Sequence, residues 1–132
     1  MTLTIDTRSI SLLEIIQAKQ VEISRDDHFV TSVNHAHDFL INQVKDGKPI
    51  YGITTGYGSS GKNYVSYEDA KELQKNLFRF HGCGIGENLS PKVCRYAVII
   101  RTISLSKSRS AVSIDLLHRL ELLLKHDIIP VI

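Results

Sequence analysis

The sequence has little cysteine, no excess of one charge and no long hydrophobic run, and each absence excludes a class of protein. Cys83 and Cys94 lie eleven positions apart without a Cys-x-x-Cys motif, which is typical of reduced thiols rather than of a zinc site. The 16 basic and 14 acidic residues are dispersed and leave a net charge of +2, too little to indicate a nucleic-acid partner. Apolar runs such as Val98-Ile99-Ile100 are far too short to span a membrane.

The two ends of the chain and its composition limit the class of protein further. Residues 1–10 lack the basic head and apolar stretch of a secretory signal, so we predict a cytoplasmic protein with no membrane partner. With 132 residues, 42% hydrophobic and 23% charged, the chain predicts a single globular domain spanning residues 1–132. Because the last residues, 128–132, are apolar where domains usually end in polar residues, we also expect a truncated chain.

Five segments have the apolar periodicity and start signals of α-helices, and no internal repeat is visible. The predicted helices begin near residues 11, 24–27, 66, 90 and 113, and two short β segments are predicted at 2–5 and 21–24. The sequence therefore predicts a mainly α fold. In the helix after Ser90 the predicted buried face consists of Val93, Ala97, Ile100 and Leu105.

The last two predicted helices also carry apolar residues on their flanks, at Ile99, Ile103, Ile114 and Leu122. Helices that are apolar nearly all round usually sit inside something larger. We therefore expect these flanks to be covered by further chain or by other subunits.

A glycine-rich stretch, Tyr51-Gly52-Ile53-Thr54-Thr55-Gly56-Tyr57-Gly58, combines sharp turns with two phenols. Together with the following Ser59-Ser60-Gly61 it matches the G-x-G-x-x-G dinucleotide pattern. The context fails, because the next helix cap is Ser66 and no acidic residue stands about 20 positions on. Nucleotide binding is therefore not expected.

The remaining residue types favour tyrosine chemistry over metal or nucleophile chemistry. His35 and His37 would point to nearly opposite faces of a helix, so they do not predict a metal site. No Ser/His/Asp grouping and no pair of carboxylates at catalytic spacing can be drawn. A phenol acts as a base only where donors stabilise the phenolate, and glycine-rich backbone offers such N–H groups. Tyr51 is the better candidate, since Tyr57 is expected to pack inward, and His81 is open between a ligand contact and a capping role.

The stretch from Tyr51 to Gly58 resembles the Tyr-Gly-x-x-Thr-Gly-Phe-Gly motif of the aromatic amino-acid ammonia-lyases. This family comprises the histidine, phenylalanine and tyrosine ammonia-lyases and related aminomutases. A second block resembles the family's Leu-Gln-x-x-Leu helix and its Gly-x-Gly turn: Leu73-Gln74-Lys75-Asn76-Leu77, then Phe80-His81-Gly82-Cys83-Gly84.

The resemblance covers most of the chain from Ile50 onward, with a weaker third block from Arg101 to Pro130. It implies the helical N-terminal domain of the ammonia-lyase, or aspartase-like, fold, with one or two short β segments. It also implies a homotetramer whose sites are shared between subunits and whose small-molecule partner is an aromatic amino acid.

In such enzymes an electrophilic 4-methylidene-imidazol-5-one, formed from an Ala-Ser-Gly tripeptide, attacks the substrate and lets ammonia leave. The resemblance implies that Tyr51 is the catalytic base for the β-proton and that glycines such as Gly58 let backbone approach the substrate. Phe80 and His81 fall where the family sorts substrates: Phe-Leu goes with phenylalanine, His-Leu with tyrosine and Ser-His with histidine. The mixed pair leaves the substrate open, with a ring contact from Phe80 and a polar contact from His81 both reasonable.

Three departures from the family pattern limit what the resemblance implies. The family's Gly-x-Ser-Gly segment is Ser108-Arg109-Ser110-Ala111, so two glycines have gained side chains and a different turn is expected. Tyr57 replaces a phenylalanine. The Ala-Ser-Gly tripeptide is absent, and Ser59-Ser60-Gly61 lies in the wrong motif to replace it.

The interpretation is the N-terminal part of an aromatic amino-acid ammonia-lyase that carries the base but not the electrophile. No cofactor is expected in this chain, the prosthetic group belongs to the full-length family member, and the isolated chain should be inactive. Lyase and aminomutase activity are both compatible with it. The alternative is a non-catalytic helical interaction or scaffold module derived from that family.

Overall fold

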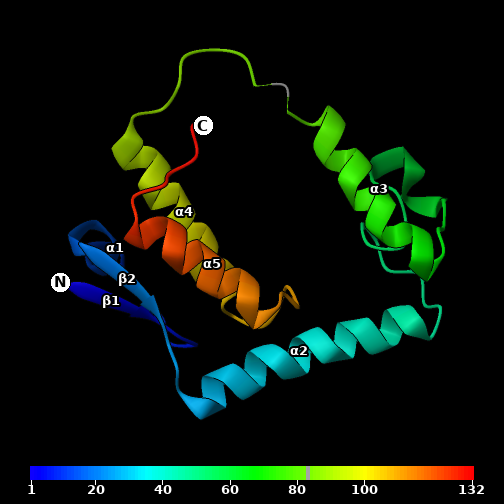
Figure 1. The fold of residues 1–132 in the computed structure, drawn as a ribbon, viewed down its shortest axis with the longest axis horizontal. Helices are drawn as coiled ribbons and strands as arrows, with labels where there is room; N and C mark the ends of the chain where they lie inside the picture. Colours follow the sequence, from blue (N-terminus) through cyan, green and yellow to red (C-terminus); the bar gives the residue numbers. More distant parts are fainter. Residues whose placement is uncertain (83) are drawn as a thin grey trace. The chain divides into compact units, whose positions relative to one another are not determined.

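The computed structural model describes residues 1–82 and 84–132, except for the side chains of Tyr67 and Phe80. The chain forms two compact units, one of residues Met1–Asp38 and Glu87–Ile132 and the other of residues Phe39–Gly86. Five α-helices and a two-stranded sheet lie in the described residues, which confirms the predicted mainly α fold (Figure 1). The predicted thiol of Cys83 lies outside the described residues, whereas Cys94 is a buried free thiol.

A small parallel sheet forms one side of the first unit. Strand β1 (Thr2–Ile5) pairs with β2 (Gln20–Ile23), with Thr2 opposite Gln20, and helix α1 (Leu12–Gln17) lies between them in the sequence. In both strands exposed and buried residues alternate, because successive side chains of a strand point to opposite faces. The two predicted β segments are therefore confirmed, with the second strand beginning one residue earlier.

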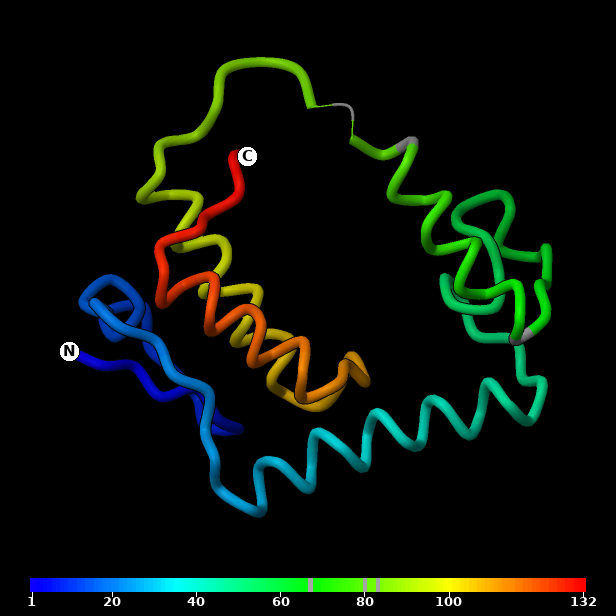
Figure 2. The backbone as a smooth tube through the Cα atoms, viewed as in Figure 1, coloured from blue at the N-terminus to red at the C-terminus, as the bar shows by residue number. Residues whose placement is uncertain are grey.

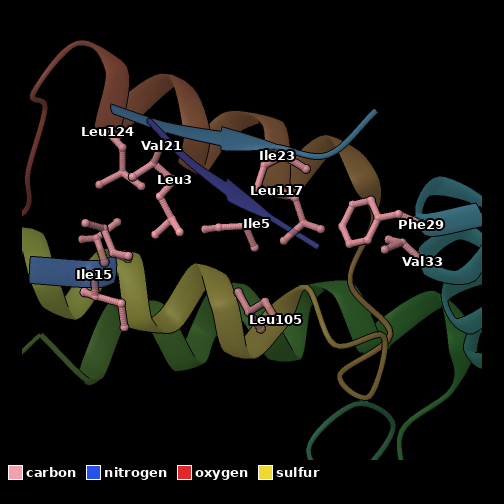
Figure 3. Close-up of a cluster of buried hydrophobic side chains, with 12 residues drawn as sticks. Leu3, Ile5, Ile15, Val21, Ile23, Phe29, Val33, Leu105, Leu117 and Leu124 are labelled. Carbon is pink, nitrogen blue, oxygen red and sulfur yellow. The ribbon is translucent and has the colours of Figure 1, made fainter. Parts of the chain in front are cut away.

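Two helices complete the core of the first unit. Helix α5 (Ile114–Lys125) packs against β2, and α4 (Pro91–Leu105) packs against α5 and α1. Figure 3 shows side chains of the two strands gathered with Leu105 of α4 and with Leu117 and Leu124 of α5. Helix α2 (Asp27–Lys45) adds Phe29 and Val33, and its residues from Phe39 onward belong to the second unit.

The predicted buried face of α4 is wrong at two of its four positions, and a third, Ala97, is only partly buried. Val93 and Ile100 are 46% and 51% exposed, whereas Val98 and Ile99 are buried. The core face includes Thr102, whose hydroxyl donates to the Val98 carbonyl oxygen at 2.8 Å and so enters the core with its donor satisfied. A sequence stripe that avoids polar residues misses such a position. Leu105 is buried as predicted.

Serine caps mark the starts of four helices as predicted. Hydroxyls of Ser11, Ser66, Ser90 and Ser113 each accept a backbone N–H in the first turn of the helix that follows. At α2 the cap is instead Asp26, whose carboxylate accepts the N–H groups of His28 and Phe29 at 3.0 and 3.1 Å. None of the helices in the described part of the chain is long and apolar enough to cross a membrane.

The capping box of α1 predicts that stability depends on pH. Hydrogen bonds from the backbone N–H and the hydroxyl of Ser11, and to a smaller extent the interaction with Arg8, lower the pKa of Glu14 from 4.5 to about 2. Since the folded value is the lower one, the stabilisation by Glu14 is complete above pH 4.5 and is lost as the pH falls toward 2. In an NMR titration the Ser11 amide should follow a midpoint near 2, and Glu14→Gln should abolish this titration. A midpoint near 4.5 would show that the capping box is not formed.

The turn before α5 keeps a left-handed backbone at the two positions where the family pattern has glycine. Ser108 has φ 56° and Ala111 has φ 50°, a region that side chains rarely adopt. The Ser108 hydroxyl has a partner in that of Ser32, at 3.2 Å, whereas the Ala111 methyl group offers no such compensation.

Replacing Ala111 by glycine is therefore expected to raise the free energy of unfolding by about 1 kcal/mol, because strain is removed at some cost in chain entropy. Urea denaturation of the two proteins measures the difference. Ser110→Gly, at a position without positive φ, serves as the control and should leave stability unchanged or lower.

Candidate functional site

Two buried threonines shape the glycine-rich loop in the second unit. The Thr54 hydroxyl accepts the Ile50 N–H at 2.9 Å and lies 3.3 Å from the Lys48 carbonyl oxygen, to which it donates. The Thr55 hydroxyl accepts the Gly52 N–H at 3.2 Å and donates to the Gly56 carbonyl oxygen at 3.0 Å. Side-chain hydroxyls thus replace backbone partners on both sides of Tyr51, which holds the turn without regular structure.

Beyond the turn the chain folds back on itself. The 3-10 helix η1 (Gly58–Lys62) is followed by a return segment, in which the Val65 N–H donates to the Thr54 carbonyl oxygen at 2.8 Å. The Gly56 N–H donates to the Asn63 carbonyl oxygen at 3.2 Å. Figure 2 shows this coiled segment beside α3 (Tyr67–Phe80).

Tyr51 lies at the start of this loop with its phenol bound by backbone. The Gly58 N–H donates to the Tyr51 hydroxyl oxygen at 2.9 Å, and Tyr51 is 65% exposed. The rings of Tyr51 and Tyr57 meet edge to face, with centroids 6.0 Å apart and planes at 76°. Gly61 lies against the Tyr51 ring, where a Cβ would come within 3.1 Å of its Cε2 atom. The predicted donor for the Tyr51 phenol is therefore the backbone N–H of Gly58. A contact between Gly58 and the substrate stays a prediction.

Tyr57 is fastened to α3 rather than buried in a core. Its hydroxyl lies 2.8 Å from the Gly52 carbonyl oxygen and 3.0 Å from Oε1 of Gln74, and the residue is 38% exposed. The inward packing expected of Tyr57 is thus only partial. Because its hydroxyl already faces two acceptors, Tyr57 is less suited than Tyr51 to take a proton.

Gln74 belongs to the block that resembles the family's Leu-Gln-x-x-Leu helix, but the sequence assigned it no role. Its Nε2 donates to the Gly52 carbonyl oxygen at 2.7 Å, so its amide contacts both Gly52 and Tyr57. The signal is its place in this motif, as a polar residue on α3 between the partly buried Leu73 and Leu77. That signal names no partner, because the partners lie 17 and 22 positions away in the sequence.

His81 caps the end of α3 and borders a cavity. Its backbone N–H donates to the Leu77 carbonyl oxygen at 3.2 Å. A cavity of about 470 Å³ is lined by His81, by Leu73 and Leu77 of α3, and by residues 56–60 of the loop. The structure therefore brings His81 and Gly58 to one cavity, whereas the Phe80 side chain lies outside the described part. No group of three or more potential metal ligands occurs among the described residues.

Comparisons with known proteins show the family of the chain. The sequence model described as aromatic amino acid lyase matches residues 9–132. The chain is similar to a probable histidine ammonia-lyase of Thermoplasma acidophilum, with 35% identity over 131 residues, which is 97% of this chain and 26% of that protein.

Solved structures share the fold. An ergothionase from Treponema denticola has a TM-score of 0.88 at 23% identity, with 99% of this chain and 27% of that chain covered. The tyrosine aminomutase from Streptomyces globisporus has a TM-score of 0.85 at 26% identity, with 94% and 24% covered. The chain thus spans about a quarter of the length of these relatives. The match over residues 9–132 and the shared fold show that the chain belongs to the aromatic amino acid lyase family.

Proposed function

We propose that this chain is the N-terminal part of an ammonia-lyase for an aromatic amino acid, in which Tyr51 removes the β-proton. The observation that carries the proposal is the hydrogen bond from the Gly58 N–H to the Tyr51 hydroxyl oxygen, inside the loop that resembles the family motif. The family match and the similarity to a histidine ammonia-lyase support the reaction class.

The surroundings of the phenol support the proposed proton transfer. The Tyr51 oxygen accepts the Gly58 N–H, and its hydroxyl donates to no partner among the described residues. Backbone N–H groups bind an oxyanion more strongly than a neutral oxygen, so the same donor would hold a phenolate in place. In the full-length enzyme the phenolate would take the proton from Cβ, and the electrons of that C–H bond would form the Cα–Cβ double bond. The amino group would leave from Cα as ammonia, with the electron pair of the C–N bond.

The prosthetic group that the resemblance implies has no source in these residues. No Ala-Ser-Gly occurs in the sequence, and Ser59-Ser60-Gly61 lies inside η1, where the Ser60 carbonyl oxygen accepts the Asn63 N–H at 2.9 Å. Residues 1–132 therefore do not fit the group. In a full-length family member the group would supply the electrophile that activates the amino group for departure.

The cavity beside His81 is the proposed place for the substrate ring. Its walls combine the apolar Leu73 and Leu77 with the imidazole of His81, which suits an aromatic side chain that carries a polar atom. Rates with histidine, tyrosine and phenylalanine, measured side by side, give the preference. Polar-ring substrates are expected to react faster than phenylalanine.

The exposed apolar residues of the first unit support the proposed homotetramer. Val93 and Ile100 of α4 and Leu122 of α5 are each about half exposed, and together they would be an unfavourable free surface. A folded chain that sediments as a monomer and binds no hydrophobic dye would contradict this assignment.

A fusion enzyme tests the proposed function. Residues 1–132 of this chain replace the matching N-terminal segment of the Thermoplasma acidophilum relative, and ammonia release from histidine is measured. Tyr51-dependent activity is the expected result. A folded fusion protein without activity would instead favour the non-catalytic module.

The purified 132-residue chain alone is predicted to release no ammonia, because a base without an electrophile leaves the amino group unactivated. The assay follows the absorbance of the unsaturated acid from histidine, phenylalanine and tyrosine. Product formation that persists through repeated purification and disappears in Tyr51→Phe would contradict this prediction.

A further inference from the structure

We propose that Gln74 is a positioning residue that holds Tyr51 in place for proton transfer, by fastening both sides of its loop to α3. The inference rests on the proposed function. It assigns to the side-chain amide of Gln74 a role in the geometry of the base, without contact between Gln74 and the substrate.

The two polar atoms of Gln74 act on the two residues that matter most for Tyr51. Nε2 of Gln74 donates to the carbonyl oxygen of Gly52, the residue after Tyr51, at 2.7 Å. Oε1 lies 3.0 Å from the hydroxyl of Tyr57, the residue before the donor Gly58. One side chain therefore restrains both the residue that carries the phenol and the residue that presents the N–H to it.

The restraint is needed because Gly52 is intrinsically free to rotate. Gly52 has φ 72°, and a glycine in this region is held by its surroundings rather than by its own sterics. The Tyr57 ring closes one side of it, where a Cβ would come within 2.9 Å of Cε1. The Gln74 amide restrains Gly52 through its carbonyl oxygen. An amide offers both the donor that the Gly52 carbonyl oxygen requires and the acceptor that the Tyr57 hydroxyl requires.

The same helix leads to the proposed substrate cavity. Gln74 lies between Leu73 and Leu77, which line the cavity with His81 at the end of α3. Gln74 lies on α3 and His81 caps its end, seven residues further along, which is about 10 Å along the helix axis. The helix therefore keeps the spacing of these two residues constant. The loop that carries Tyr51 is thereby held in a fixed position relative to α3, the helix that lines the proposed substrate cavity.

The test compares Gln74→Leu with the unchanged chain by amide hydrogen exchange at Gly58. The leucine keeps the size of the side chain but removes both hydrogen bonds. Gly58 exchange should become at least about tenfold faster, the effect expected from the loss of one hydrogen bond alone. In the fusion enzyme the same change should lower kcat about tenfold while KM stays within threefold, since the substrate walls are unchanged. Gln43→Leu is the matched control: its Oε1 accepts from Lys48 at 2.6 Å, and its loss should change neither quantity.

Tyr57→Phe provides a second variant that keeps the ring and removes one hydroxyl. It should accelerate Gly58 exchange in the same direction by a smaller factor. Unchanged Gly58 exchange in both variants would overturn the role of Gln74, whatever their activity. Failure of the proposed function is distinguishable, because it would appear as equal rates for the parent fusion enzyme and its Tyr51→Phe variant.

Discussion

Replacing Tyr51 by phenylalanine is expected to lower kcat of the fusion enzyme by about 10²- to 10⁴-fold, the range for a positioned general base. The ring of Tyr51 stays in place against Gly61 and Tyr57, so only the oxygen that accepts the Gly58 N–H is lost. KM should change by less than about threefold, because the phenol contributes in the transition state more than in the ground state. Initial rates over a range of histidine concentrations separate the two constants.

Tyr64→Phe is the matched control for this variant. Tyr64 is 50% exposed, and its backbone forms the antiparallel bridge with Thr55, so a hydroxyl is removed from the same unit without touching the Tyr51 phenol. Its kcat should equal that of the parent. A Tyr51→Phe enzyme that retains parental kcat would remove Tyr51 from the reaction.

Replacing Gly52 by alanine is expected to destabilise the loop by about 2–4 kcal/mol, through strain at positive φ and overlap with the Tyr57 ring. The new Cβ would lie 2.9 Å from Cε1 of Tyr57, and this ring cannot retreat easily while its hydroxyl is bound to Gln74. Amide exchange at Val65, whose N–H donates to the Thr54 carbonyl oxygen, reports the opening of the loop.

Gly47→Ala separates the two causes of this effect. Gly47 has φ 74°, almost the same as Gly52, but a methyl group added there would meet no atom within 4 Å, so only the backbone strain applies. It should cost about 1 kcal/mol. Equal effects of the two substitutions would show that the Tyr57 ring does not restrain Gly52.

Local sequence signals predicted the helices well. The serine caps at residues 11, 66, 90 and 113 were all found, because a cap depends on residues within one turn of it. The buried face of α4 was found only in part, because Ile99 and Ile100 are equally apolar and only the position of α5 and α1 decides between them.

The contacts of the candidate site were likewise predicted only in part. The family motif pointed to Tyr51, and general chemistry pointed to a backbone donor for it, which the structure provides at Gly58. The contacts of Gln74 and of the Thr54 and Thr55 hydroxyls were not predicted, because the type of a polar residue does not indicate which polar group it will contact. Such partners follow from the path of the chain, which only the folded structure supplies.

The most direct test of Tyr51 as the base is the loss of deuterium from Cβ of a β-deuterated histidine in the fusion enzyme. We expect the parent enzyme to release the label to water with ammonia formation. The Tyr51→Phe enzyme should still bind histidine but release the label at least about 10²-fold more slowly. Release of the β-deuterium at the parental rate by a folded Tyr51→Phe enzyme would contradict the assignment of Tyr51 as the base.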